Sequence, residues 1–90
     1  MFFVRYESIT MEVPDPIHGT ITLSPLCAAF ARHRWFERLK RVQQLGTGSY
    51  VFPQATHTRW EHSLGTCHLA QQLVHALQQA GAPIEAWEAE

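Results

Sequence analysis

The chain has little of several features that assign a sequence to a class at once. Its only cysteines, Cys27 and Cys67, form neither a CxxC motif nor a disulfide framework, which predicts a reducing, intracellular compartment, nucleus or cytoplasm. Five glycines and five prolines are too few for a disordered linker. The apolar start at Met1–Val4 is too short for a signal peptide, and no run is long enough to span a membrane. We therefore expect no membrane partner.

Charge is also scarce, since 17% of the residues are charged and the net charge is −1. What the chain does have is a hydrophobic content of 46%, which is typical of a globular protein, and its 90 residues allow one small domain at most. Five of its seven cations lie between Arg32 and Arg41. This segment has two interpretations, an ordinary solvated helix face or a surface that contacts nucleotides or single-stranded nucleic acid.

The pattern along the chain predicts a mainly α fold, in which a short β-hairpin is followed by two short helices and one long helix. Strand-forming residues at 2–6 and 20–23 predict the hairpin, and the prolines and glycine of 13–19 predict turns between them. The predicted segments are a β element at 2–23, helices at 24–45, a connector at 46–55, the long helix at 56–81 and the start of another helix at 82–90.

Two helix starts carry specific capping signals. Ser24 followed by Pro25 places a capping hydroxyl before a proline at the first helical position. Thr58 and Glu61 have the spacing of a capping box, in which each side chain accepts a hydrogen bond from the other residue's backbone. The long helix is therefore expected to begin at Thr58.

Arg59 and His62 are three positions apart and share one face of this helix. The line from His62 through Leu69 and Leu73 is apolar, so we expect it to face the core and His62 to point inward. An inward imidazole can bind a metal or simply satisfy a backbone group. Arg59, beside the free N–H groups of the helix start, can bind phosphate or remain a solvated arginine.

Several short motifs occur in one order along residues 11–80. They are Asp15-Pro-Ile-His-Gly19, Phe36-Glu-Arg-Leu39, Gln44-Leu-Gly46, Tyr50-Val-Phe-Pro53 and His57-Thr-Arg-Trp-Glu-His-Ser-Leu-Gly65. Together they resemble the opening of HD-domain phosphohydrolases, above all the deoxynucleoside triphosphate (dNTP) triphosphohydrolases with a sterile-alpha-motif domain and their bacterial relatives. The resemblance implies an HD fold and hydrolysis of a dNTP to the deoxynucleoside and triphosphate.

The resemblance also implies roles for four residues. His62 matches the first metal ligand of the family, for a divalent ion such as Zn, Fe, Mn or Mg. Arg59 matches the arginine that contacts the substrate phosphate. Gln44 and Leu45 match the pair that lies against the deoxyribose.

The sequence departs from the family in the rest of the metal site. It contains no His-Asp dipeptide, and Asp15 is its single aspartate. One imidazole does not hold a catalytic metal, which normally takes at least three protein ligands. We therefore expect an incomplete HD domain, the N-terminal part only, that neither holds a metal stably nor hydrolyses dNTP alone. The alternative is a non-catalytic module that binds nucleotide or single-stranded nucleic acid, forms homo-oligomers, or docks onto a full-length relative.

Overall fold

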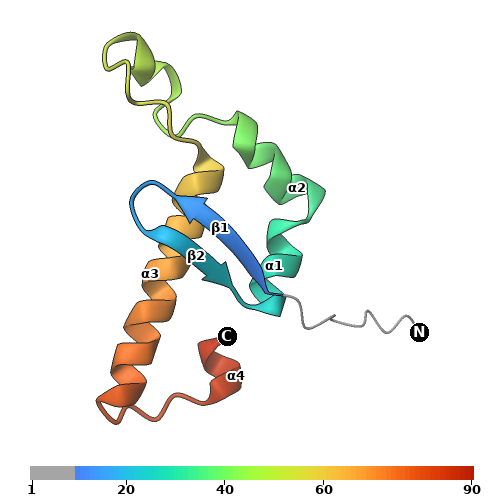
Figure 1. Cartoon of the computed structure of the whole chain (residues 1–90), viewed down its shortest axis with the longest axis vertical. Coiled ribbons are helices and arrows are strands. Elements are labelled where there is room, and N and C mark those ends of the chain that lie inside the picture. The colour runs from blue at the N-terminus through green and yellow to red at the C-terminus, as the bar shows by residue number, and fades with distance from the viewer. Residues whose placement is uncertain (1–9) are drawn as a thin grey trace, which may run out of the picture.

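The computed structural model describes residues 10–90 and contains a two-stranded sheet and a set of helices around one long helix (Figure 1). Its elements are β1 (Met11–Asp15), β2 (Gly19–Leu23), α1 (Pro25–Ala31), α2 (Arg34–Glu37), the 3-10 helices η1 (Arg38–Arg41) and η2 (Gly46–Tyr50), α3 (Arg59–Gln79) and α4 (Ala86–Ala89). The predicted mainly α fold with a short β-hairpin is confirmed. None of the helices in this part of the chain is long and apolar enough to cross a bilayer.

The hairpin joins β1 to β2 in antiparallel register, with Val13 opposite Ile21. Both of these side chains are buried. The segment 13–19 was predicted to be turns because of its prolines, yet the strand runs through Pro14. A proline is tolerated there because both strands of a two-stranded sheet are edges. The strand predicted over 2–6 lies outside the described residues.

The helical region predicted over 24–45 begins as predicted but ends earlier. α1 begins after Ser24, whose Oγ accepts the Cys27 N–H at 3.2 Å, as the capping signal predicts. The helical region then ends early, because α2 passes into η1 and Val42 is extended. The extended residues form an isolated antiparallel bridge between Gln43 and Thr58, a pairing across the fold that a local pattern does not reveal.

α3 begins where the sequence predicts. The Thr58 side chain accepts the Glu61 N–H at 3.2 Å, and the Glu61 carboxylate accepts the Thr58 N–H at 3.4 Å, so the capping box is present. Gly81 follows the helix end with a φ of 94°, a conformation that glycine adopts without strain. The helix itself ends at Gln79, close to the predicted boundary.

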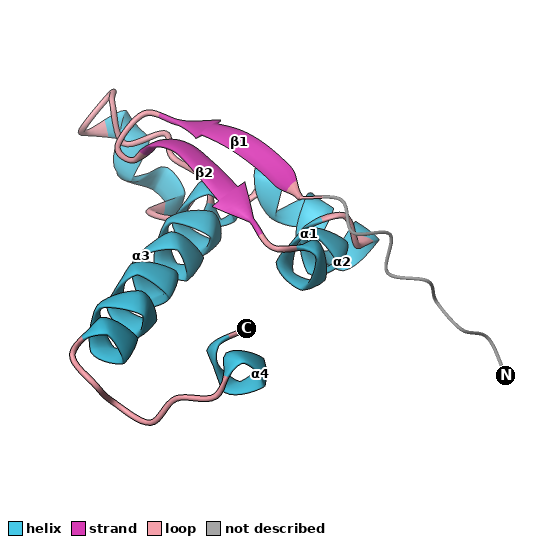
Figure 2. Cartoon of the chain, turned by 60° about the horizontal axis from the view of Figure 1, so that its bottom comes forward, coloured by secondary structure: helices cyan, strands magenta, loops and turns pink. Residues whose placement is uncertain are grey.

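The core lies between the hairpin, α1 and one face of α3 (Figure 2). Its buried residues are Val13, Ile21, Leu23, Ala28, Ala31 and Leu64. The line from His62 through Leu69 and Leu73 was predicted to face the core, and this prediction was wrong. Leu69 is 53% exposed, Leu73 is 61% exposed, and His62 is also exposed. The hairpin packs against the side that carries Leu64, and no described residues cover the leucine line.

Candidate functional site

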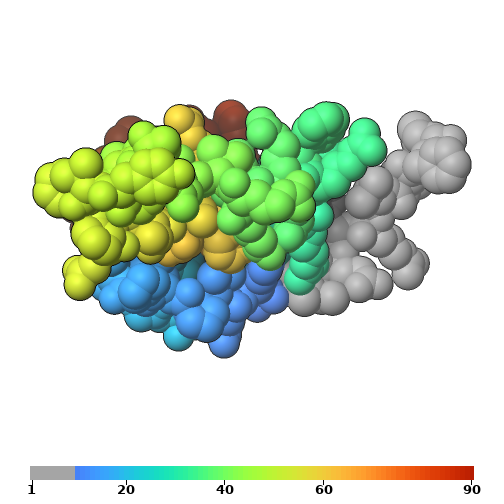
Figure 3. All heavy atoms as spheres, turned by 90° about the horizontal axis from the view of Figure 1, so that it is seen from above, coloured from blue at the N-terminus to red at the C-terminus, as the bar shows by residue number. Residues whose placement is uncertain are grey.

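A cleft of about 430 Å³ lies where the hairpin turn, the connector and the first turns of α3 meet. Figure 3 shows these three segments side by side, the turn in blue, the connector in yellow-green and the start of α3 in orange. The residues that line it are Asp15, Pro16, Ile17, His18, Gln54, His57, Glu61, His62, Gly65, Thr66 and Leu69. Segments far apart in sequence therefore share one cavity.

The hairpin wall of the cleft is held in shape by Asp15. Its Oδ2 accepts the backbone N–H of His18 at 2.9 Å and of Ile17 at 3.0 Å, and Gly19 follows with a φ of 73°. The loop of three residues, 16–18, is thus stabilised by the aspartate before it and followed by a left-handed glycine. The hydrogen bond from His18 is the main cause that lowers the pKa of Asp15 below its ordinary 3.8, and the Ile17 bond adds to it.

The turn sits directly on α3. The His18 ring lies 5.0 Å from the His68 ring, at an interplanar angle of 49°. A Cβ added to Gly65 would lie 3.4 Å from His18 Nε2, at ordinary contact distance, so the His18 ring lies directly against this position of the helix. The motif that begins at Asp15 and the motif that ends at Gly65 therefore meet in space.

The α3 wall of the cleft begins with the capping box and contains His62. The Glu61 carboxylate is engaged in the capping box, because its Oε1 accepts hydrogen bonds from the N–H and the hydroxyl of Thr58. His62 lies one residue further on and lines the cleft. Arg59 is the first residue of the helix and is exposed, but it lies outside the cleft lining.

Backbone hydrogen bonds hold Gln44 close to the start of α3. Its N–H donates to the His57 carbonyl at 3.0 Å, and the Arg59 N–H donates to the Val42 carbonyl at 2.8 Å. Leu45 follows and is 55% exposed. The backbone of Gln44 thus lies beside the segment that leads into α3, while the side chains of Gln44 and Leu45 do not line the cleft.

Sequence reasoning did not assign site roles to several residues of the cleft, among them Asp15, His18 and His57. The signal that could have found them is present, because all three lie in the motifs that carry the family resemblance. His57 and His62 are five positions apart, a spacing that does not fit a helical pair of ligands. His57 lies before the helix, outside any helix or strand, and still lines the cleft.

The residues at this site do not by themselves fit a metal centre. Within residues 10–90, no three histidine, cysteine, aspartate or glutamate side chains converge as metal ligands. His62 can offer one imidazole, whereas a zinc or iron site takes at least three protein ligands. The cleft lining instead combines imidazoles and the Gln54 amide with apolar side chains such as Ile17 and Leu69.

Comparison with known proteins gives a consistent result. The chain is 52% identical over 75 residues to the human deoxynucleoside triphosphate triphosphohydrolase SAMHD1, a match that covers 82% of this chain and 12% of the human protein. The SAMHD1 homolog of Dictyostelium discoideum is 36% identical over 78 residues, which cover 87% of this chain and 15% of that protein. No family model matches.

A solved structure agrees with the sequence matches. A phosphohydrolase from Bacteroides thetaiotaomicron superposes with a TM-score of 0.85 and 36% identity, over 88% of this chain and 20% of that protein. The chain thus spans a small part of the length of the proteins it matches. The sequence and fold together place the chain among the HD-domain phosphohydrolases related to deoxynucleoside triphosphate triphosphohydrolase, as the N-terminal portion of an HD domain.

Proposed function

We propose that this chain supplies the phosphate-binding, N-terminal portion of an HD-domain hydrolase that converts a dNTP to the deoxynucleoside and triphosphate. The activity is named for SAMHD1, of which the chain covers 12%, so it is carried over to this chain as a proposal. The observation that supports it most is that Arg59, His62 and the Gln44 backbone gather at one end of α3, beside the cleft.

Arg59 is suited to bind a phosphate. It is exposed at the first position of α3, and no ion pair involving it is found within residues 10–90. A cation at a helix N-terminus is opposed by the helix dipole, at a cost of about 0.3–1 kcal/mol when exposed. An anionic ligand removes that cost and accepts bidentate hydrogen bonds from the guanidinium group.

His62 and the segment 44–45 supply the remaining assignments. In the proposed site His62 is one of the ligands of a divalent metal, and Gln44 and Leu45 lie against the deoxyribose. Because one imidazole does not make a metal centre, no hydrolytic step is assigned to the described residues. We expect these residues alone to bind triphosphate weakly and not to hydrolyse dNTP.

The proposal is tested by measuring equilibrium binding of inorganic triphosphate and of dGTP to the chain by calorimetry. Arg59→Ala should weaken both affinities by about 10- to 100-fold, because a hydrogen-bonded charge contributes about 1.5–3 kcal/mol. Arg38→Ala is the matched control, since Arg38 is also an exposed arginine but lies in η1. Equal affinities for Arg59→Ala and the unchanged chain would overturn the phosphate-binding role.

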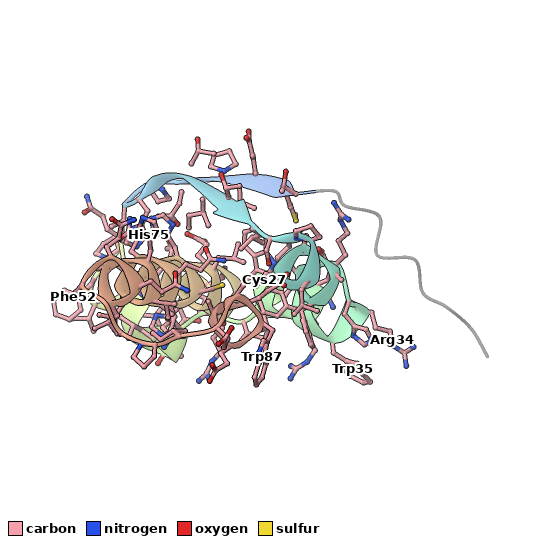
Figure 4. The ribbon with its side chains drawn as sticks, turned by 90° about the horizontal axis from the view of Figure 1, so that it is seen from below. Cys27, Arg34, Trp35, Phe52, His75 and Trp87 are labelled. Atoms are coloured by element: carbon pink, nitrogen blue, oxygen red, sulfur yellow. The ribbon has the colours of Figure 1, made fainter. Side chains whose placement is uncertain are left out.

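A second candidate function is binding of single-stranded nucleic acid through the basic segment Arg32–Arg41. The guanidinium carbon of Arg34 lies 5.1 Å from the centroid of the Trp35 ring, and Trp35 is 61% exposed. Both side chains extend outward from α2 (Figure 4). Exposed aromatic rings with neighbouring cations are what single strands stack on.

This candidate makes a separate prediction. Replacing Arg34, Arg38 and Arg41 with glutamate should abolish binding to a polynucleotide and remove its dependence on salt concentration. The affinity for inorganic triphosphate should stay unchanged. Polynucleotide binding that persists in the triple variant with the same salt dependence excludes the basic segment as the binding surface.

A further inference from the structure

The two cysteines, which the sequence places far apart, lie together in the fold. Cys27 belongs to α1 and Cys67 to α3, and their Sγ atoms are 3.8 Å apart. Both are free thiols. Neither residue belongs to the motifs that carry the family resemblance or to the lining of the cleft.

The thiol pair lies at the rim of the core. Both cysteines are partly buried and pack against the core cluster that includes Ala28 and Leu64. Cys27 lies on the part of α1 nearest α3 (Figure 4). The pair therefore joins α1 to α3 beside the core residues that the two helices share. The thiols are packed well enough to be held near each other and exposed enough to meet a small reagent.

We propose that Cys27 and Cys67 form a reversible intramolecular disulfide when the chain meets a hydroperoxide, which makes the pair a redox modification site that links α1 to α3. A bonded pair has its sulfurs about 2 Å apart, so the two thiols need to approach by about 1.8 Å. Rotation about the Cα–Cβ bond moves a sulfur by at least this much, and neither cysteine is fully buried.

The chemistry balances with hydrogen peroxide as the oxidant. The Cys27 sulfur attacks one peroxide oxygen, the O–O bond breaks, and Cys27 becomes a sulfenic acid while one water leaves. The Cys67 sulfur then attacks the Cys27 sulfur, the S–S bond forms, and the S–O bond breaks. Hydroxide leaves with the Cys67 proton as the second water, so two thiols lose two electrons and two protons and the peroxide gains them.

The order of these steps follows from the surroundings of Cys67. Burial and the nearby Cys27 raise the pKa of the Cys67 thiol from 9.0 to about 11, so it remains protonated at neutral pH. A protonated thiol is a poor nucleophile, which makes Cys67 the resolving partner rather than the group oxidised first. The rate of disulfide closure should therefore increase as the pH rises toward the pKa of Cys67.

The test treats the whole purified chain with a small excess of hydrogen peroxide and measures intact mass, free thiols and mobility on a non-reducing gel. We expect a monomer that has lost two hydrogen atoms, has no thiol available to iodoacetamide, and returns to its starting mass with dithiothreitol. The oxidised monomer should also melt about 10 °C higher, because the cross-link closes a long loop in the unfolded chain.

Two variants distinguish this site from ordinary thiol oxidation. Cys27→Ser and Cys67→Ser each leave one thiol and should give sulfenic or sulfinic acid or intermolecular dimers, without the monomer that lacks two hydrogens. The unmodified chain is itself decisive, so failure of a variant to fold does not affect the outcome. Oxidation of the unmodified chain mainly to sulfinic acids or to disulfide-linked dimers would overturn the proposal.

Discussion

At the scale of single residues, Asp15 has a defined structural role in the hairpin turn. Its carboxylate accepts two backbone N–H groups, and their hydrogen bonds lower its pKa below 3.8. A group whose pKa is lower in the folded state stabilises the fold above its unfolded pKa. That contribution is lost as the pH falls through the folded pKa. Asp15 should therefore make the fold less stable in acid.

Asp15→Asn separates the charge from the hydrogen bonds. An asparagine oxygen can still accept from Ile17 and His18, so the variant should keep most of its stability at pH 7 but lose part of the fall in stability below a pH of about 4. Asp15→Ala should lose about 1 kcal/mol at pH 7, because both hydrogen bonds are removed. Urea unfolding at neutral and acid pH measures both effects. An Asp15→Asn chain with the unchanged pH profile contradicts this account.

His62 shows what residue identity could and could not predict. The family motif identified it as a site residue, and the structure places it on the cleft wall. The helical pattern predicted it to be buried, and it is exposed. A helix with apolar residues on more than one side does not specify which side packs, because that depends on where the hairpin and α1 lie.

At the scale of elements, helix starts were predicted well because their signals are local. Ser24 and Thr58 each cap a helix through hydrogen bonds to residues three positions away, and the structure contains both caps. The end of the helical region before Val42 was missed. The helical region ends there because Gln43 forms a bridge with Thr58, and a local sequence pattern does not reveal a pairing between distant segments.

The capping box of α3 should contribute measurably to stability. Thr58→Ala removes the hydroxyl that accepts the Glu61 N–H and should lower the free energy of unfolding by about 1 kcal/mol. Ser63→Ala is the control, because the Ser63 hydroxyl only donates to the Arg59 carbonyl inside the helix. Its effect should lie within about 0.5 kcal/mol. Equal losses in the two variants would show that the box does not stabilise the helix start.

At the scale of the whole molecule, several large apolar side chains are exposed away from the hairpin. Figure 4 shows Trp35 and Trp87 on that side, and they are 61% and 78% exposed. Leu69 and Leu73 of α3 add to the exposed apolar area, and the helix has no lysine, arginine, aspartate or glutamate after Glu61. Exposed apolar surface of this extent favours association.

The chain should therefore associate in a concentration-dependent way in sedimentation experiments. Leu69→Gln combined with Leu73→Gln should reduce association with little loss of stability, because both leucines are more than half exposed. Leu64→Ala, in the core at 3% exposure, should instead cost about 2–5 kcal/mol. A chain that sediments as a monomer at all concentrations and melts cooperatively would contradict this expectation.

The central claim is that the start of α3 binds the phosphates of a nucleotide, and amide chemical shifts during a dGTP titration test it most directly. The account predicts that shifts concentrate at His57–His62 and at Gln44, and that they disappear in Arg59→Ala but persist in Arg38→Ala. Shifts confined to Arg32–Arg41, or shifts at α3 that are the same in Arg59→Ala, would contradict it.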